Sequence, residues 1–185
     1  MLTKTRATVE DLYNVPDHGK AELVNGELRY IGPMGMLPAR ASGRILSSLY
    51  QYEEENGGGF PVGGKTGILI DLPNRQSFSP CAAWHTGPDT GMKFLEGAPK
   101  FAVEVRSKGD CGPAADQDSE DKIRDYFAAG TLIVWDVDLK NEYNEIIKSY
   151  RFDNPETPII FRRGEVADAE PAVPGWRFPV NDLFR

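Results

Sequence analysis

The segment between residues 101 and 138 constrains the fold more than any other part of the sequence. It contains two apolar runs rich in β-branched side chains, FAVEVRS at 101–107 and TLIVWDVD at 131–138. A helical pattern over 118–129, ended by Gly130, separates the two runs. This order is typical of parallel strands joined by a right-handed helical crossover. The sequence therefore predicts an α/β fold whose second strand is buried on both faces.

Shorter elements are predicted on both sides of this unit. The residues from Thr8 to Asp11 form a capping-box variant at the start of a short helix, and Asn25-Gly26 between two strand-like runs predicts a β-hairpin. The other predicted elements are a helix over 39–56, strands at 67–72, 82–85, 144–152 and 158–163, and an aromatic tail at 175–184 that docks on the core. We expect a single domain spanning residues 1–185, with a mixed β-sheet flanked by helices and an N-terminal helix and hairpin.

Composition limits the function classes. Acidic residues outnumber basic ones by 28 to 21, and the formal net charge of -7 argues against sequence-blind binding to nucleic acid or to an anionic membrane. No apolar run approaches the roughly 20 residues of a membrane span, and the N-terminus lacks the apolar core of a secretion signal. Cys81 and Cys111 form no C-x-x-C pair, and His18 and His85 are too few for a histidine-rich zinc site. We therefore expect a cytoplasmic protein without a membrane partner.

Residues 59–66, GFPVGGKT, match the phosphate-loop pattern G-x-x-x-x-G-K-[ST]. A phosphate loop needs a strand before the glycines and a helix directly after them, because the amide groups at the start of that helix bind the phosphates. Here the predicted helix precedes the glycines, and a β-rich run, GILIDL, follows them. We therefore reject a nucleotide site at this position and predict a flexible connection with a solvated lysine.

The strand at 101–107 carries a better candidate for a functional site. Alternation along a strand places Ala102, Glu104 and Arg106 on one face. A carboxylate in this position is costly to bury unless it is paired or bound to a metal ion. An ion pair between Glu104 and Arg106 would satisfy it without any functional role. The crossover helix must pack over the same sheet and carries Lys122, so a third charged group can reach this face.

Four segments in a fixed order add a resemblance to this pattern: AELVNGEL at 21–28, SFSPCAAW at 77–84, GAPKFAVEVRS at 97–107 and KIRDYFAAGTLIVWDVD at 122–138. Together they resemble the Uma-two family of bacterial endonucleases, in the restriction-endonuclease-like PD-(D/E)XK superfamily. The resemblance covers essentially the whole chain. It implies a four-stranded mixed core flanked by helices, and hydrolysis of phosphodiester bonds with Mg²⁺ or Mn²⁺. It also implies a nucleic-acid partner, with DNA preferred, a homodimer and a location in the bacterial cytoplasm.

The resemblance assigns roles to individual residues. Glu104 falls on the second acid of the family motif, which is expected to ligate the divalent cation. Lys122 falls on the helical lysine that orients or polarises the attacking water. Arg106 occupies the motif's original lysine position, where it would hold a phosphate because it is too basic to act as a base. Glu22 falls on the acid of the early hairpin, which is expected to join the catalytic residues, although an exposed strand glutamate is the alternative.

The first acid of the motif is absent, because Cys81 stands where relatives read aspartate in Ser-Pro-Asp. A protonated thiol carries no charge, and a thiolate favours softer metals than Mg²⁺. Cys81 is therefore a plain buried thiol in an impaired enzyme, an altered metal ligand beside Glu104, or the product of a mutation. His85 lies on the same face of the strand as Cys81. Four residues along a strand span about 13 Å, which is too far for the two side chains to bind the same metal ion. We expect an impaired nuclease or, as the alternative, a non-catalytic interaction or dimerisation module.

Overall fold

The computed structural model describes residues 6–64, 66–110 and 112–185. The helices are α1 (Val9–Tyr13), α2 (Met36–Asn56) and α3 (Pro113–Ala129), with 3-10 turns η1 (Pro16–His18) and η2 (Val180–Phe184). The strands are β1 (Lys20–Val24), β2 (Glu27–Ile31), β3 (Phe60–Gly63), β4 (Ile68–Leu69), β5 (Ser77–Phe78), β6 (Ala82–His85), β7 (Leu95–Glu96), β8 (Phe101–Val105), β9 (Ile133–Val137), β10 (Ile147–Arg151), β11 (Asn154–Phe161), β12 (Val166–Asp168) and β13 (Arg177–Pro179).

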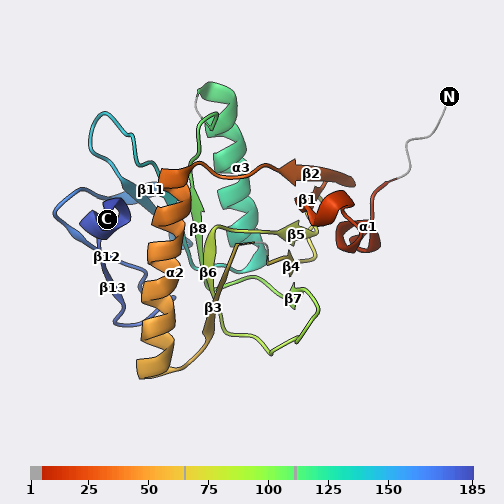
Figure 1. The fold of residues 1–185 in the computed structure, drawn as a ribbon, viewed down its shortest axis with the longest axis horizontal. Coiled ribbons are helices and arrows are strands. Elements are labelled where there is room, and N and C mark those ends of the chain that lie inside the picture. The colour runs from red at the N-terminus through yellow and green to blue at the C-terminus, as the bar shows by residue number, and fades with distance from the viewer. Residues whose placement is uncertain (1–5, 65, 111) are drawn as a thin grey trace.

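A central sheet of six strands, in the order β11-β10-β9-β8-β6-β3, organises the fold. Its two middle strands, β8 and β9, are parallel, and every other neighbouring pair is antiparallel. Figure 1 shows α2 and α3 on opposite sides of this sheet. The predicted α/β fold with a mixed sheet and a helical crossover is therefore confirmed. The sheet has six strands rather than the four that the resemblance implied, because β3 and β11 add an outer strand at each edge.

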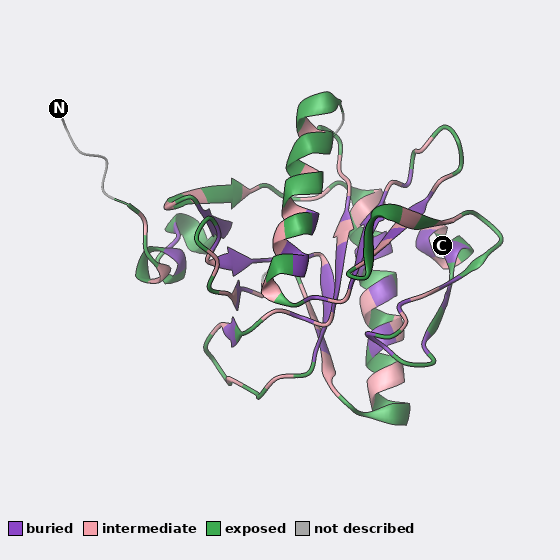
Figure 2. Cartoon of the chain, turned by 180° about the vertical axis from the view of Figure 1, so that it is seen from behind, coloured by how far each residue is buried: buried purple, intermediate pink, exposed green. Residues whose placement is uncertain are grey.

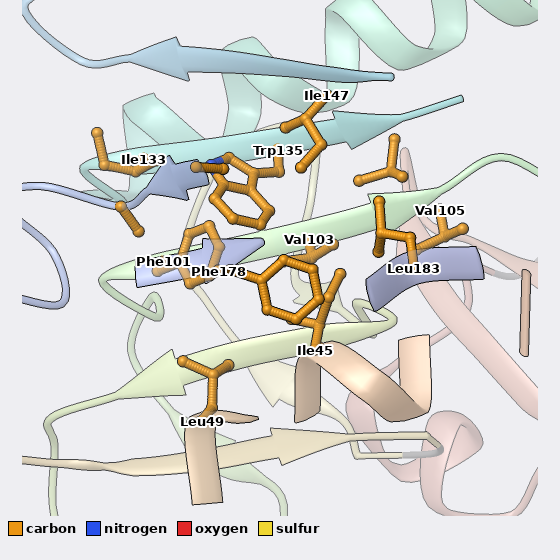
Figure 3. Packing of buried hydrophobic residues seen from close by; sticks show 14 of the residues in the cluster. Ile45, Leu49, Phe101, Val103, Val105, Ile133, Trp135, Ile147, Phe178 and Leu183 are labelled. Carbon is orange, nitrogen blue, oxygen red and sulfur yellow. The ribbon is translucent and has the colours of Figure 1, made fainter. Parts of the chain in front are cut away.

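The main hydrophobic core lies between the sheet and α2. Ile45 and Leu49 of α2 pack with Phe101, Val103 and Val105 of β8, and Figure 3 shows these side chains pointing toward one another. The aromatic tail predicted at 175–184 closes the same core, and its Phe178 and Leu183 side chains are almost fully buried. Burying a large apolar side chain contributes about 1.5–3 kcal/mol, so this face supplies much of the stability.

The opposite face of the sheet forms a second core with α3. Ala102 and Val134 pack there against Ile123, Tyr126 and Phe127 of the helix. Alternate residues of β8 therefore face different helices, as the strand period predicts. Figure 2, viewed from the α3 side, shows the strands of the central sheet mostly buried and the outer side of α3 exposed. Glu104 follows Ala102 at strand spacing, so its carboxylate points toward α3.

The N-terminal elements match the sequence patterns. Thr8 and Asp11 make the predicted capping box, in which the Thr8 N–H donates to Oδ2 of Asp11 at 2.7 Å and the Asp11 N–H donates to Oγ1 of Thr8 at 3.4 Å. β1 and β2 pair as the predicted hairpin around Asn25 and Gly26. These two turn residues have φ angles of 53° and 73°, the left-handed region that an Asn-Gly turn provides.

Element boundaries differ from the predictions at several places. α2 begins at Met36 rather than at 39, and its Leu37 continues the core-facing period of Ala41 and Ile45. α3 begins at Pro113 rather than at 118, and its first turn carries no large apolar side chain. GILIDL contributes only β4, which joins β5 and β7 in a separate small sheet.

In GFPVGGKT, Gly59 precedes β3, Gly63 ends it and Gly64 follows it, and the next described element is the strand β4 rather than a helix. Lys65 itself lies outside the described residues. The rejection of a phosphate loop therefore agrees with the order of elements. No described helix is both long and apolar enough to cross a bilayer.

Candidate functional site

The carboxylate in the middle of β8 meets a lysine of α3. Nζ of Lys122 lies 2.8 Å from Oε1 of Glu104 and 2.8 Å from Oε1 of Glu22. The three side chains come from α3, β8 and β1, which are separated by long stretches of sequence. Three of the residues singled out in the sequence thus converge at one place, which we call the Lys122 cluster: Glu22, Glu104 and Lys122.

Glu22 reaches the cluster because β1 is fastened to the segment that precedes β6. The Leu23 N–H donates to Oγ of Ser77 at 2.8 Å, and the Gln76 N–H donates to the Leu23 carbonyl at 2.9 Å. Glu22 is only 5% exposed, and both of its oxygens are engaged. Oε1 accepts from the Ser79 N–H at 2.8 Å, and Oε2 accepts from Nη1 of Arg75 at 2.7 Å. The alternative that Glu22 is an exposed strand glutamate is therefore wrong.

Arg75 extends the cluster along α3 to Asp125. Its Nε donates to Oδ2 of Asp125 at 2.7 Å, so one buried guanidinium joins two carboxylates. Sequence reasoning missed both residues. Asp125 lies three positions after Lys122 on the same helix face, which is a signal that the helical period contains. Arg75 lies in a loop, and nothing in the local pattern indicates its role.

Tyr126 also belongs to the site, one helical turn after Lys122. Its hydroxyl donates to Oε1 of Glu104 at 2.7 Å, and its ring stacks on Phe78 with ring centroids 3.8 Å apart. Burial together with the charges of Glu104 and Glu22 raises the pKa of Tyr126 well above its usual value, so the hydroxyl keeps its proton and remains a donor. Tyr126 fixes the position of the Glu104 carboxylate.

Charge balance in the cluster keeps Lys122 and Glu22 ionised. Burial disfavours the ammonium of Lys122, but the two carboxylates outweigh burial and raise its pKa. Burial likewise disfavours the carboxylate of Glu22, but Lys122 and Arg75 outweigh it and lower the pKa of Glu22. Lys122 is therefore a permanent cation at neutral pH. It can donate hydrogen bonds to a phosphate or a water molecule, but it cannot act as a general base.

Cys81 lies directly before β6 and beside the end of β8. Its Sγ accepts a hydrogen bond from the Val105 N–H at 3.4 Å, and it forms no disulfide. Burial and the charge of Glu104 raise the pKa of the Cys81 thiol, so it is neutral at pH 7 and brings no negative charge to the site. Cys111, the other cysteine, lies outside the described residues.

Arg106 follows β8, and its guanidinium binds other carboxylates than the one expected. Its Nε and Nη2 donate to the two oxygens of Asp136 at 2.9 and 2.7 Å, and its Nη1 donates to Oδ1 of Asp116 at 2.6 Å. The alternative in which Arg106 neutralises Glu104 is therefore wrong, because Lys122 and Tyr126 hold Glu104 instead. The neighbouring strand supplies the stronger partner: Asp136 of β9 is almost fully buried. The role of Arg106 toward a phosphate stays a prediction.

Comparison with known proteins identifies the family. The profile of the Uma2 (Uma-two) family, described as "Putative restriction endonuclease", matches residues 7–181. The chain belongs to the Uma2 family. A solved structure titled as a putative nuclease belonging to DUF820, from Anabaena variabilis ATCC 29413, superposes with a TM-score of 0.73. The two chains are 13% identical, and the alignment covers 96% of this chain and 97% of the other, so the likeness concerns the fold. No curated protein matches the sequence.

Uma2 membership raises the question of whether these residues fit a divalent metal ion. A hard cation needs several oxygen ligands, at least two of them anionic in sites of this kind. Both oxygens of Glu22 and one oxygen of Glu104 already accept hydrogen bonds from cationic or neutral donors, and the Lys122 ammonium lies between the two carboxylates. Within the described residues, no three acidic, histidine or cysteine side chains are grouped to hold a metal ion. The donor set therefore does not fit Mg²⁺ or Mn²⁺ as it stands.

Proposed function

We propose that this Uma2 protein is a nuclease-fold domain that acts on nucleic acid, with an impaired site for phosphodiester hydrolysis at the Lys122 cluster. The observation that carries the proposal is the pair of 2.8 Å contacts from Lys122 to Glu104 and Glu22. Charges removed from water are costly, and this cluster brings the buried Glu22 together with the half-buried Glu104 and Lys122 at the junction of the sheet, the hairpin and α3. Groups with such perturbed pKa values gather at functional sites more often than elsewhere.

Each member of the cluster has a place in this proposal. The Lys122 ammonium binds a phosphate oxygen or orients the attacking water, and Tyr126 holds the Glu104 carboxylate in position. Cys81 explains the impairment, because a neutral thiol stands where the first acid of the family motif would supply a further carboxylate beside Glu104. The substrate that we propose is DNA, in keeping with the family description.

Restoring the missing acid tests the proposal. Cys81→Asp places a carboxylate beside Glu104, and we expect it to bind Mn²⁺ in calorimetric titration and to cleave plasmid or single-stranded DNA with Mg²⁺ or Mn²⁺ but not with chelator. The unchanged protein should show little or no cleavage. Cys81→Ser is the matched control, because it keeps the size of the side chain and adds no charge. The double variant Cys81→Asp with Glu104→Gln should show neither the Mn²⁺ binding nor the cleavage gained by Cys81→Asp.

Two outcomes of this experiment would count against the proposal. The first is a Cys81→Asp protein that folds, as judged by thermal unfolding, and gains neither metal binding nor cleavage under any condition. Equal cleavage by Cys81→Asp and by its Glu104→Gln double variant would mean that the activity does not come from this site. Metal binding to the folded state should also raise the melting temperature of Cys81→Asp but not that of Cys81→Ser.

A non-catalytic interaction or dimerisation module is the second candidate, and a specific observation favours it. Three cations that would line a basic groove are already paired: Arg106 with Asp136, Lys122 with Glu104 and Arg124 with Asp121. Pairing leaves less positive charge for a nucleic-acid backbone. If the protein is such a module, Cys81→Asp gains neither metal binding nor cleavage, and sedimentation shows a homodimer. A nuclease requires the cleavage described above.

A further inference from the structure

A second site opens at the carboxyl ends of the two parallel strands. A cavity of about 760 Å³ lies where the chain leaves β8 and β9, between the start of α2 and the first turns of α3. In open α/β sheets, ligands bind at this edge, and the volume is in the range of small-molecule sites. None of the three residues of the Lys122 cluster lines the cavity, so it is a separate feature.

Charged residues line much of the cavity: the acidic ones are Asp110, Asp116, Glu120, Asp136 and Asp138, and three of the basic ones are lysines. Lys108 follows β8, Lys140 follows β9, and Lys148 lies on β10, where its side chain is half-buried. Across the chain as described, no carboxylate lies within ion-pair distance of these three ammonium groups, whereas Arg106 beside them is bound to Asp136 and Asp116. Ammonium groups without a carboxylate partner can donate hydrogen bonds to an anion such as a phosphate.

The cavity also has an apolar wall and one aromatic ring. Met36 and Leu37 of α2 and Leu139 after β9 form the apolar wall, and the half-buried Tyr150 lies two residues after Lys148 on β10, on the same face of the strand. Burial and the charge of Asp136 raise the pKa of Tyr150 to about 12, so its hydroxyl is neutral at pH 7. An apolar wall and an aromatic ring beside cationic groups suit a ligand with a planar ring at one end and an anion at the other.

We propose that this cavity binds one nucleotide unit, with its phosphate on Lys108, Lys140 and Lys148 and its base against Tyr150 and the apolar wall. The inference rests on the proposed function, since the site lies next to the Lys122 cluster: Asp136, which lines the cavity, is the strand neighbour of Glu104. A nucleotide held here would be adjacent to the phosphodiester that the cluster attacks. The cavity would thus select which part of a strand enters the site.

Binding of deoxynucleoside monophosphates in chelator tests the inference without any hydrolysis. We expect calorimetric binding to the unchanged protein, and about tenfold weaker binding by Lys148→Ala, since one charge-assisted hydrogen bond is lost. Lys148→Arg should restore most of the affinity. Tyr150→Ala should weaken nucleotide binding but not the binding of inorganic phosphate. The control is Lys93→Ala, an exposed lysine outside the cavity, which should bind like the unchanged protein. Lys122→Met, in the cluster, tests whether the nucleotide binds there instead.

Three results would overturn the inference. The folded protein could fail to bind any of the monophosphates at millimolar concentration. Inorganic phosphate could bind as tightly as the nucleotides and be indifferent to Tyr150→Ala, which would leave a simple anion site. Binding could also be lost in Lys122→Met and kept in Lys148→Ala, which would place the nucleotide at the cluster. Because no metal or cleavage enters these titrations, their outcome is independent of whether Cys81→Asp gains activity.

Discussion

Replacing Lys122 by methionine removes the ammonium and keeps most of the side-chain volume. The substitution leaves Glu104 and Glu22 facing each other without the cation that lies 2.8 Å from each of them. Removing one partner of a buried ion pair costs about 3–5 kcal/mol, because the remaining charge is left uncompensated. The Lys122 cluster is therefore expected to be a major contributor to the stability of this fold as well as a candidate site.

Two features of the structure place the cost at the lower end of that range. Glu104 is 23% exposed, so water can solvate part of its charge, and Glu22 keeps its contacts with Arg75 and the Ser79 N–H. We expect Lys122→Met to lower the free energy of unfolding by about 3 kcal/mol at pH 7. For a chain of this size, that corresponds to a melting temperature lower by about 6–12 °C.

The dependence on pH separates this electrostatic cost from a packing defect. The pKa of Glu22 is lowered from its ordinary value of 4.5, so its contribution is present above that pH and is lost as the pH falls toward the folded-state pKa. The pKa of Lys122 is raised from 10.5, so its contribution is present below that pH and is lost only in stronger alkali. The difference between Lys122→Met and the unchanged protein should thus be full between about pH 5 and 10 and shrink in acid.

Urea unfolding at pH 7, 5 and 3.5 measures this difference, with Lys93→Met as the control. Lys93 is an exposed loop lysine, and its substitution should change stability by less than about 0.5 kcal/mol. The reasoning is refuted if Lys122→Met is as stable as Lys93→Met at pH 7. It is also refuted if the loss is the same at pH 3.5 as at pH 7, since a pH-independent loss would come from packing alone.

Two further predictions concern buried polar groups. Arg75→Ala leaves Glu22 and Asp125 without their shared guanidinium, and urea unfolding should show a loss of about 3–5 kcal/mol, against almost none for the exposed Arg29→Ala. His85 is 2% exposed, and neither ring nitrogen has a hydrogen-bond partner among the described residues. Burial lowers the pKa of His85 from 6.5, so the unfolded chain binds a proton that the folded chain does not, and stability falls as the pH drops through 6.5. His85→Leu should reduce the stability lost between pH 7 and 5, and an unchanged pH profile would contradict this assignment.

Local patterns in the sequence determined most of the elements. The alternation in FAVEVRS correctly divided β8 between the two faces of the sheet, and the Asn-Gly pair and the Thr8–Asp11 spacing correctly marked the hairpin and the first helix. These features were predictable because they depend on side chains a few residues apart. The edge strand β3 escaped prediction, since its four residues include a proline and a glycine and lie among further glycines.

The partners of the charged side chains were decided only by the tertiary structure. The sequence indicated that Glu104, Arg106 and Lys122 would share one region, and it left open an ion pair between Glu104 and Arg106. In the folded chain β9 places Asp136 beside β8, where it forms an ion pair with Arg106, and α3 places Lys122 within ion-pair distance of Glu104. Periodicity along one element determines on which face a side chain lies. It does not determine which of several oppositely charged groups becomes its partner. That choice depends on the register between strands and on the docking of distant loops, such as the one that carries Arg75.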